Sequence, residues 1–365
     1  MQYDQPTSAP EILAGLDANG SVTVATRYAI ETLLGLTNPA GGSATVGLWD
    51  GDSILVSPGG EAPQLLLVTV PGAAGDDIIL DIPSQIMSTT QAYIFGSRAD
   101  LTMTWNTPLE RVIVSGNGDD TLTVKGDQDT TIDGAAGDDT IVTRGGDDWV
   151  IGSAGDDSIS TGAGNDTIVT GVDDDIIDGG EGFDIAAIMG ADRDDVDLII
   201  NESGQLVMLA AYIDDNDDLI LSETETSNIE FIQLADNDAV AIARNVPDQI
   251  TLSLYQGVLG RAPDAAGAAY WLDYEPVGLG IAESFLESDE FTGKFGDVDD
   301  LTDAELVEIL YENALGREPE PAGLDYWVNA LEGGEERAAV AVSIITSEEG
   351  RENIDSVFLL LGDNA

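Results

Sequence analysis

A nine-residue pattern of apolar and polar positions dominates the middle of the chain. Beginning with GAAGDDTIVTRGGDDWVIGSAGDD at residue 134, a β-branched residue recurs at the eighth position of successive units, namely Ile141, Val150, Ile159, Ile168 and Ile177. A period of nine matches neither an α-helix nor a single long strand, so each unit predicts a tight turn followed by a very short strand. β-branched residues at this spacing suit strands whose alternate side chains point inward.

Glycine and aspartate occupy the other fixed positions of the unit. Glycines cluster in the first four positions, where a tight turn needs the positive φ that glycine adopts without steric cost. The sixth position is acidic in every unit, at Asp139, Asp148, Asp157, Asp166, Asp175 and Asp184. Two units depart from the glycine pattern, because Thr143 and Arg144 begin one turn and Asp173 replaces a turn glycine in another.

Further copies of the pattern lie upstream. SGNGDDTLT (115–123) fits the register with Asp120 at the sixth position, whereas KGDQDTTID (125–133) is offset by one residue and is interpreted as a degraded unit. GAAGDDIIL (72–80) lies well outside the array, and we expect a loop there rather than a metal site.

The segments on either side of the array follow other periods and divide the chain into four predicted regions. Residues 1–110 are β-rich with one possible helix at YAIETLLGL (28–36), forming either a cap or irregular coils that lead into the repeats of residues 111–187. Residues 188–246 contain longer apolar runs separated by turn residues, which predict β-hairpins that cap the array. Within them, DDNDD (214–218) is expected to be a solvated turn. From residue 247 the periodicity is helical.

The helical region, residues 247–365, contains an internal repeat. LYQGVLGRAPDAAGAAYW (254–271) and LYENALGREPEPAGLDYW (310–327) are identical at ten of eighteen positions, so the two copies span 254–297 and 310–350. We expect a helix to end at Gly260 and at Gly316, and Thr302 with Glu305 to form a capping box. NIDSVFLLLGDNA (353–365) predicts an amphipathic helix followed by an apolar run and an acidic tail.

Two sets of side chains that recur in both copies have alternative interpretations. Arg261 and Arg317 could meet an acidic partner or a sugar, but in so acidic a region each is expected to find an internal carboxylate. The aromatic pairs could stack on a saccharide, but core packing is the preferred interpretation for Tyr270, Trp271, Tyr326 and Trp327.

Composition restricts the function more than the pattern alone. With 12 Lys+Arg against 70 Asp+Glu, the formal net charge is −58, which disfavours nucleic acid and anionic lipid as partners and attracts divalent cations. Hydrophobic residues make up 43% of the chain, so it is no disordered acidic tail. The absence of His and Cys excludes a His-ligated zinc protease, a Ser-His-Asp hydrolase and disulfides. The sequence contains neither an N-terminal export signal nor a run of apolar residues long enough to span a membrane.

The spacing of the aspartates gives this charge a specific role. Coiling strands stack about 4.7 to 4.9 Å apart, and calcium lies about 2.3 to 2.6 Å from each oxygen ligand, so one ion fits between carboxylates of adjacent layers. Without it, like charges about 4 Å apart repel by about 4 kcal/mol at an effective dielectric constant of about 20. The sequence therefore predicts a calcium-dependent array.

The units GAAGDDTIV, GSAGDDSIS and TGAGNDTIV closely resemble the G-G-x-G-x-D-x-U-x calcium-binding repeat of RTX proteins. The resemblance implies a parallel β-roll with two units per coil, with Asp139, Asp157 and Asp175 on one edge and Asp148, Asp166 and Asp184 on the other. It also implies that carbonyls of the glycine turns complete each calcium shell. The implied ligand residues are Asp120, Gly134, Gly137, Asp139, Gly146, Asp148, Gly152, Gly155, Asp157, Gly162, Gly164, Asp166, Asp175, Gly180, Gly182 and Asp184.

Other segments resemble parts of secreted bacterial proteins. The two helical copies are similar to a module of unknown role that recurs beside RTX arrays, and some of its members resemble phycobilisome linker domains. The C-terminal segment resembles the uncleaved signal of type I secretion. These resemblances imply a mainly β fold, consisting of a calcium-binding parallel β-roll with a hairpin cap, followed by a small all-α repeat domain.

Three functions remain open from the sequence. We favour a secreted, non-enzymatic, calcium-folded structural protein of the cell surface or matrix, which forms homo-oligomers or homopolymers such as a filament, a layer or an adhesive coat. Trp149, at an outward-facing seventh position, is a candidate contact. The second is an extracellular protein that binds a cell-surface polysaccharide or mediates adhesion. The third, ranked last, is an RTX-linked enzyme acting on glycans, for which no particular pair of carboxylates stands out.

Overall fold

The computed structural model places two compact units in the chain, Met1–Ile229 (unit 1) and Glu230–Ala365 (unit 2). It describes residues 7–8, 23–34, 43–44, 46–49, 54–55, 63–106, 108–171, 173–188, 191–213, 219–235, 238–273 and 279–360. The boundaries of the four regions expected from the sequence stay a prediction.

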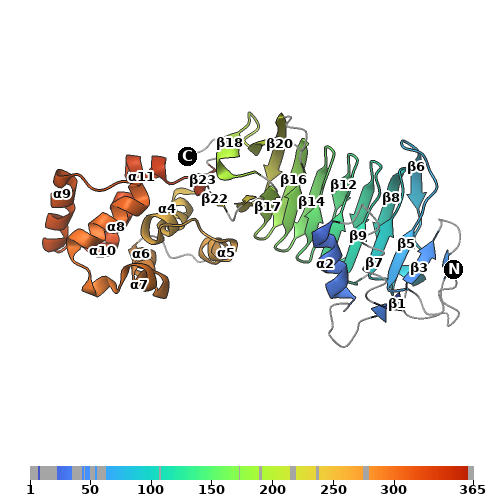
Figure 1. Cartoon of the computed structure of the whole chain (residues 1–365), viewed down its shortest axis with the longest axis horizontal. Helices are drawn as coiled ribbons and strands as arrows, with labels where there is room; N and C mark the ends of the chain where they lie inside the picture. The colour runs from blue at the N-terminus through green and yellow to red at the C-terminus, as the bar shows by residue number, and fades with distance from the viewer. Residues whose placement is uncertain are drawn as a thin grey trace. The chain divides into compact units, whose positions relative to one another are not determined.

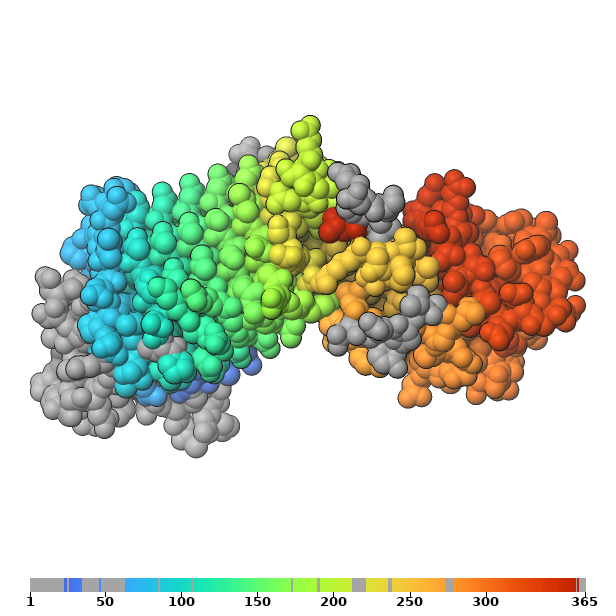
Figure 2. Space-filling model, turned by 180° about the vertical axis from the view of Figure 1, so that it is seen from behind, coloured from blue at the N-terminus to red at the C-terminus, as the bar shows by residue number. Residues whose placement is uncertain are grey.

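Unit 1 is a parallel β-solenoid of about six turns, which confirms the predicted fold class. Each coil contributes one strand to sheet 1 and one to sheet 2, so consecutive strands alternate between the two sheets (Figure 1). The coils follow one another in chain order as bands of changing colour in Figure 2. In spatial order, the coil strands of sheet 1 are β6 (Asp77–Leu80), β8 (Asp100–Trp105), β10 (Thr121–Val124), β12 (Thr140–Val142), β14 (Ser158–Ala163) and β16 (Asp175–Glu181). Those of sheet 2 are β5 (Leu65–Val68), β7 (Ala92–Phe95), β9 (Arg111–Val114), β11 (Thr130–Asp133), β13 (Trp149–Ile151), β15 (Thr167–Thr170) and β17 (Ile185–Ile188). Before β5, sheet 2 continues with β3 (Val46–Trp49), which pairs in parallel with β5, and β4 (Ile54–Leu55), which pairs antiparallel with β3.

The eighth-position residues form the interior of the solenoid, as predicted. In sheet 1, Ile141 pairs with Ile159, and Ile159 with Ile177, so identical side chains stack in a column. In sheet 2, Val150 pairs with Ile168. All five are buried. Each such side chain contributes about 1.5 to 3 kcal/mol by burial, and the nine-residue step places one in every strand.

A hairpin layer continues sheet 1 beyond the last coil. The strand β20 (Leu219–Ser227) pairs in parallel with β16 and antiparallel with β19 (Leu206–Ile213), which pairs antiparallel with β18 (Val196–Ile200). A short 3₁₀ turn, η1 (Arg193–Asp195), precedes β18. The acidic segment 214–218, expected to be a solvated turn, lies outside the described residues.

The region before the array contains coils as well as a helix. Parallel pairing joins β3, β5, β7 and β9, although their sequences lack the nine-residue motif. The buried rings of Tyr93, Phe95 and Trp105 fill this part of the interior, with centroids 5.7 to 6.3 Å apart. The remaining elements here are α2 (Val24–Leu33), α3 (Ser84–Met87) and the antiparallel pair β1 (Thr7–Ser8) and β2 (Ser43–Ala44).

One expectation for this region is wrong. Residues 72–80 do not form a loop throughout, because only their first half is a turn and β6 follows it, paired in parallel with β8. The adjacent β-branched residues Ile78 and Ile79 favour pairing once a neighbouring strand is present. Asp77, at the sixth position of this copy, is exposed, unlike the aspartates of the array.

Unit 2 combines a small sheet with helices. The antiparallel pair β21 (Phe231–Gln233) and β22 (Ala239–Ala243) is joined in parallel by β23 (Val357–Leu359). The helices are α4 (Val246–Leu254), the π-helical turn η3 (Tyr255–Leu259), α5 (Ala265–Asp273), α6 (Leu279–Leu286), α7 (Asp289–Phe295), the 3₁₀ turn η4 (Val298–Asp300), α8 (Asp303–Leu315), α9 (Pro321–Glu332), α10 (Arg337–Ile345) and α11 (Glu348–Asn353).

The helix ends in unit 2 follow the sequence. Gly260 and Gly316 end η3 and α8 in left-handed conformation, with φ of 64° and 63°, which is a common C-terminal arrangement. Thr302 and Glu305 form the predicted capping box. The amphipathic helix expected at the start of residues 353–365 is wrong, since only Asn353 is helical there, as the last residue of α11, and Val357–Leu359 form β23 beside Ala241 and its neighbours. Residues 361–365 lie outside the described part of the chain.

Candidate calcium centre

The sixth-position aspartates line two opposite edges of the solenoid. We call edge 1 the turns that lead from sheet 2 into sheet 1; they carry Asp120, Asp139, Asp157 and Asp175. Edge 2 consists of the turns from sheet 1 into sheet 2, which carry Asp148, Asp166 and Asp184. All seven side chains are at most 2% exposed. Burial of so many carboxylates is costly and calls for compensation.

One oxygen of each carboxylate is used by the backbone of the preceding coil. On edge 1, the Asp139 N–H donates to Asp157 Oδ1 at 2.8 Å, and the Asp157 N–H donates to Asp175 Oδ1 at 3.0 Å. On edge 2, the Asp148 N–H donates to Asp166 Oδ1 at 2.7 Å. These bonds fix the orientation of each carboxylate and stack the sixth positions in register.

The other oxygen distinguishes aspartates that accept a bond from their own turn from aspartates for which the turn supplies no donor. Asp120 Oδ2 accepts a bond from the Gly116 N–H at 2.9 Å, and Asp175 Oδ2 accepts one from the Gly171 N–H at 3.2 Å. Asp139, Asp148, Asp157 and Asp166 each have a buried Oδ2 atom without a hydrogen-bond partner within the described residues. A buried carboxylate oxygen without a donor is the kind of atom that a cation stabilises.

The glycine turns bring backbone close to these oxygens. A side chain at Gly134 would overlap Asp139 Oδ2, and one at Gly152 would overlap Asp157 Oδ2. A side chain at Gly155 would overlap the carbonyl of Gly137 in the preceding coil. The predicted glycines with positive φ are Gly137, Gly146, Gly155, Gly162, Gly164, Gly180 and Gly182. The turns therefore form a cradle of closely stacked carbonyls that only glycine permits.

Burial makes the aspartates resist ionisation in the calcium-free protein. It raises the pKa of Asp139 to about 9 and the pKa of both Asp148 and Asp157 to about 7. The pKa of Asp175 rises to about 6 for the same reason. Neighbouring carboxylates add to the effect, as Asp157 does for Asp139. A bound divalent cation would reverse this preference, because it stabilises the ionised form.

The donor set fits calcium. Every candidate ligand atom is a carboxylate or carbonyl oxygen, as calcium prefers. No group of three or more acidic side chains converges on one point among the described residues, so backbone carbonyls would have to supply most of each shell. The stacked glycine turns provide such carbonyls.

Comparison with known families decides the nature of the array. Residues 126–159 and 151–186 match the family model described as RTX calcium-binding nonapeptide repeat (4 copies). These segments are RTX calcium-binding repeats. Residues 282–354 match a domain of unknown function (DUF4214). No curated protein and no solved structure matches the chain.

RTX repeats indicate that the chain binds calcium, which confirms the predicted cofactor. The assignment of individual ligands stays a prediction, and the geometry ranks them. Asp139 and Asp157 on edge 1, with Asp148 and Asp166 on edge 2, offer oxygens that no donor satisfies. Calcium bound at these atoms would neutralise the two rows of stacked charge.

The degraded unit keeps its place in the ladder but has no carboxylate at the sixth position. Its offset of one residue places Thr130 at the sixth position, where the Thr130 N–H donates to Asp148 Oδ1 at 2.7 Å. In the unit with Asp173 in place of glycine, Asp173 Oδ2 accepts a bond from the Gly155 N–H at 3.1 Å. The turn before Asp175 therefore differs from the glycine turns, which agrees with the satisfied Oδ2 of Asp175.

A second row of acids at the fifth position was missed by the sequence analysis. On edge 1, Asp138 N–H donates to Asp119 Oδ1 at 3.0 Å and Asp156 N–H to Asp138 Oδ1 at 3.0 Å. On edge 2, Asp147 N–H donates to Asp129 Oδ1 at 2.9 Å. These side chains are exposed. The recurring Asp-Asp pairs in the repeat could have revealed them.

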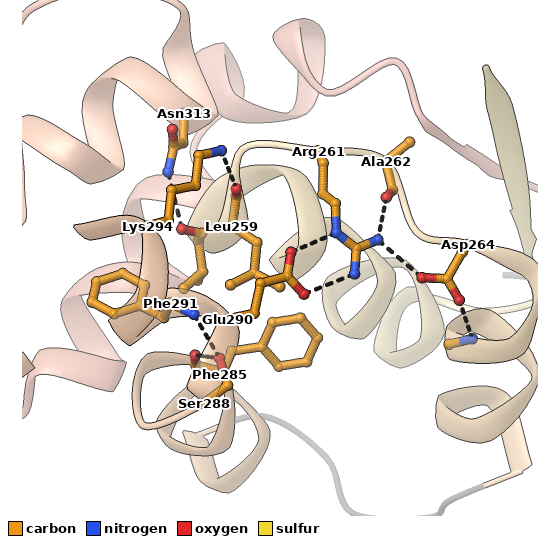
Figure 3. A network of polar contacts seen from close by, with 12 residues as sticks. Leu259, Arg261, Ala262, Asp264, Phe285, Ser288, Glu290, Phe291, Lys294 and Asn313 are labelled. Carbon is orange, nitrogen blue, oxygen red and sulfur yellow. Dashed lines mark hydrogen bonds and ion pairs between the residues drawn. The ribbon is translucent and has the colours of Figure 1, made fainter. Parts of the chain in front are cut away.

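The arginines of the helical copies pair with internal carboxylates, which was the preferred interpretation of the sequence. Figure 3 shows Arg261 bound to Glu290 by two hydrogen bonds of 2.6 and 2.9 Å and to Asp264 at 3.1 Å. Arg317 forms the equivalent network with Glu349 and Glu320. Arg261 also lies 5.0 Å from the centroid of the Tyr255 ring. Each arginine therefore joins elements within its own copy.

The prediction that both aromatic pairs pack in the core is only partly correct. Tyr270 is 57% exposed and Tyr326 is 65% exposed, while the adjacent Trp271 and Trp327 are half-buried. Each tyrosine meets its tryptophan edge to face, at 5.0 and 4.8 Å between centroids. The tyrosines are therefore surface residues in both copies.

No helix in the described part of the chain is long and apolar enough to span a bilayer.

Replacement of a central aspartate should affect calcium binding more than replacement of a terminal one. We expect Asp157→Ala and Asp166→Ala each to weaken calcium affinity by at least about tenfold, because each removes an oxygen that has no other partner. Asp175→Ala is the matched control, since its Oδ2 is satisfied by Gly171. Calorimetric titration with calcium measures the difference. An equal or larger loss in Asp175→Ala would contradict the ranking.

Two turns carry a residue other than glycine in left-handed conformation, Ala135 at φ 69° and Ser153 at φ 82°. Gly162 and Gly180 occupy the same second position in other units. Ala135→Gly should stabilise the calcium-bound protein by up to about 1 kcal/mol, since it relieves this strain. Thermal unfolding in calcium measures the effect, and Ala136→Gly, at the neighbouring third position, is the control. A lower Tm for Ala135→Gly would refute the strain argument.

Proposed function

We propose that the chain is a secreted structural protein of the cell surface or extracellular matrix, whose copies assemble after calcium has folded them. The observation that carries the proposal is the set of four central Oδ2 atoms without donors, on a chain of net charge −58. Such an array folds stably only where calcium is plentiful. RTX proteins are typically secreted, and their repeats are generally structural and non-enzymatic.

Calcium-coupled folding would also assist export. In a calcium-poor cytoplasm the array would remain unfolded and able to pass through a narrow channel, and outside the cell calcium would stabilise the native state by mass action. A secretion signal at residues 353–365 belongs to this proposal. Within that segment, Val357–Leu359 form β23, so the signal would act before this strand pairs.

Self-assembly is supported by an open edge at the start of the solenoid. In the described part of unit 1, sheet 1 ends at β6, which pairs on one side only, with β8. Ile79 on this strand is 81% exposed. A strand edge with an exposed apolar residue is a template for pairing with another chain. We propose that this edge takes part in homopolymer formation.

The test follows light scattering and circular dichroism together through one calcium titration. Assembly should require more calcium than folding, because ions bridging carboxylates of different molecules occupy weaker sites. Ile79→Lys should reduce assembly without changing folding. Thr102→Lys, an exposed substitution on the adjacent strand β8, is the matched control. A folded protein that stays monomeric at millimolar calcium and high concentration would refute the proposal.

A second candidate function is binding to a cell-surface polysaccharide. Tyr270 and Tyr326 favour it, because they are exposed at equivalent positions of the two copies. Aromatic rings beside polar groups suit the stacking of saccharide rings. A glycan-binding screen with wild type and with Tyr270→Ala/Tyr326→Ala tests this function. Binding that is lost in the double variant would support it, and an absence of binding by wild type would reject it.

A further inference from the structure

A cavity of about 460 Å³ lies between α2 and the outer surface of sheet 2 in unit 1. Tyr28 and Leu33 line it from α2, and Val112, Thr131 and Trp149 line it from β9, β11 and β13. Figure 1 shows α2 lying across these strands, in agreement with its contacts to β9 and β11. The volume is within the range of pockets that hold small molecules.

The helical wall of this cavity is attached to the solenoid. Ile30 of α2 and Leu34, which follows the helix, are buried against Val112 and other apolar residues of sheet 2. At the start of the helix, the Thr26 hydroxyl donates to Asp133 Oδ2 at 2.8 Å, and Asp133 is fully buried. The apolar contact and the buried carboxylate hold α2 in place. The cavity is therefore a formed feature of the unit.

Two exposed aromatic rings give the cavity its chemistry. Tyr28 is 67% exposed and Trp149 is 43% exposed, although both are large and partly apolar. One comes from the helix and the other from the sheet. Aromatic faces attract cations through their quadrupole, most strongly for Trp, and recognise methylated ammonium groups. Such groups are weakly hydrated and suit mostly apolar walls.

Charged groups around the cavity favour the same kind of ligand. Glu110, Asp129 and Asp147 line it. Arg111 also lines it but is 1% exposed, and its guanidinium donates to the carbonyls of Thr90 and Met87. Acidic groups at an aromatic cavity favour a cationic ligand and disfavour an anionic one.

We propose that this cavity binds an organic ammonium group, with methylated ammonium preferred. The cation contacts the faces of Tyr28 and Trp149, and the carboxylates of Asp129, Asp147 and Glu110 supply the compensating charge. This site is separate from the calcium ligands in its chemistry, because its aromatic rings cannot coordinate calcium. It gives the solenoid a ligand-binding role beyond a structural one.

The test uses the full-length protein in saturating calcium. Choline chloride is titrated against its neutral isostere, 3,3-dimethylbutan-1-ol, and binding is followed by tryptophan fluorescence and by calorimetry. Sodium chloride at equal ionic strength controls for screening. We expect saturable binding of choline with a Kd of about 1 mM or tighter, and binding of the isostere weaker by at least about tenfold.

Variants locate the site. Tyr28→Ala and Trp149→Ala should each weaken choline binding by about tenfold, and Trp149→Phe should retain most of it because the ring remains. Trp327→Ala, in unit 2, is the control and should leave the affinity unchanged. Calcium titration of each variant checks that the array is intact; Asp147→Asn, next to Asp148, needs this check most and should weaken choline binding.

The outcomes separate the alternatives. Equal affinity for choline and its isostere, unchanged binding in both Tyr28→Ala and Trp149→Ala, or no saturable choline binding would each overturn the proposal. A parallel titration with Nα-acetyl-lysine amide identifies the source of the cation. Tighter binding of the lysine derivative would contradict the preference for methylated ammonium, and tighter binding of choline would support a methylated small molecule or headgroup.

Discussion

Chelation of calcium is expected to unfold the nonapeptide coils, residues 115–188, while the helices of unit 2 remain folded. The reason is the stacking of buried carboxylates on both edges. Without calcium at neutral pH, these groups must either stay ionised, with a repulsion of about 4 kcal/mol per close pair at an effective dielectric constant of about 20, or take up protons when the chain folds. Their central Oδ2 atoms have no partner among the described residues. Unit 2 contains no RTX match and is stabilised by its own apolar core and by ion pairs.

The earlier coils should respond less to chelation. The strands β7 and β8 carry the buried rings of Tyr93, Phe95 and Trp105, and Asp77, at the sixth position of the turn after β5, is exposed, unlike the buried aspartates of the array. Trp105 therefore reports on these coils and Trp149 on the array. Variants that retain one of these two tryptophans distinguish partial from complete unfolding of unit 1.

Circular dichroism with and without chelator measures the main effect. The β signal should fall strongly while the helical signal persists, and added calcium should restore it. Magnesium is the control, since it requires a smaller, near-octahedral site and retains its waters. A fully formed solenoid in chelator, or equal restoration by magnesium, would show that calcium does not stabilise the array.

Acidification is expected to stabilise the calcium-free array. The pKa of Asp139 is raised to about 9 and that of Asp148 and Asp157 to about 7, against about 3.9 in the unfolded chain. The folded state therefore binds more protons. The contribution of these groups is fully present below about pH 4 and is lost as the pH rises through 6 to 9. For each group, the change is on the order of 1.4 kcal/mol for each unit of pKa difference.

Calcium affinity should change with pH in the opposite direction to the stability of the calcium-free array. Calcium requires ionised carboxylates, so its affinity should rise with pH across the same interval. Urea unfolding at pH 5 and pH 8, in chelator and in calcium, tests both statements. In chelator the midpoint should be higher at pH 5. With calcium, the stabilisation that the ion adds should be larger at pH 8.

One variant distinguishes the effect of these buried aspartates on stability from the effect of the net charge of the chain. Asp157→Asn resembles the protonated carboxyl, so it should stabilise the calcium-free array at pH 8 and weaken calcium binding. Asp156→Asn removes the same charge from an exposed fifth-position neighbour and is the matched control. If both variants shift the chelator midpoint equally, net charge rather than the buried row would cause the pH dependence.

The sequence by itself determined the repeating unit of unit 1. Ile141, Ile159 and Ile177 recur every eighteen residues and form one interior column, because two nine-residue units make one coil and each coil places the same side chain inward. The helix ends at Gly260 and Gly316 were also predictable. Local backbone conformation decides such positions, and glycine reaches left-handed φ at little cost.

The tertiary structure alone decided which aspartates keep an unsatisfied oxygen. Asp157 and Asp175 occupy the same sixth position, but only Asp175 accepts a bond from its own turn, through the Gly171 N–H. The same holds for Val357–Leu359, which resemble a helical segment in sequence and become a strand beside β22. It also holds for the cavity between α2 and Trp149, whose walls lie more than a hundred residues apart in the chain. These features depend on which backbone groups and faces distant segments bring together, and a local pattern contains no information about those contacts.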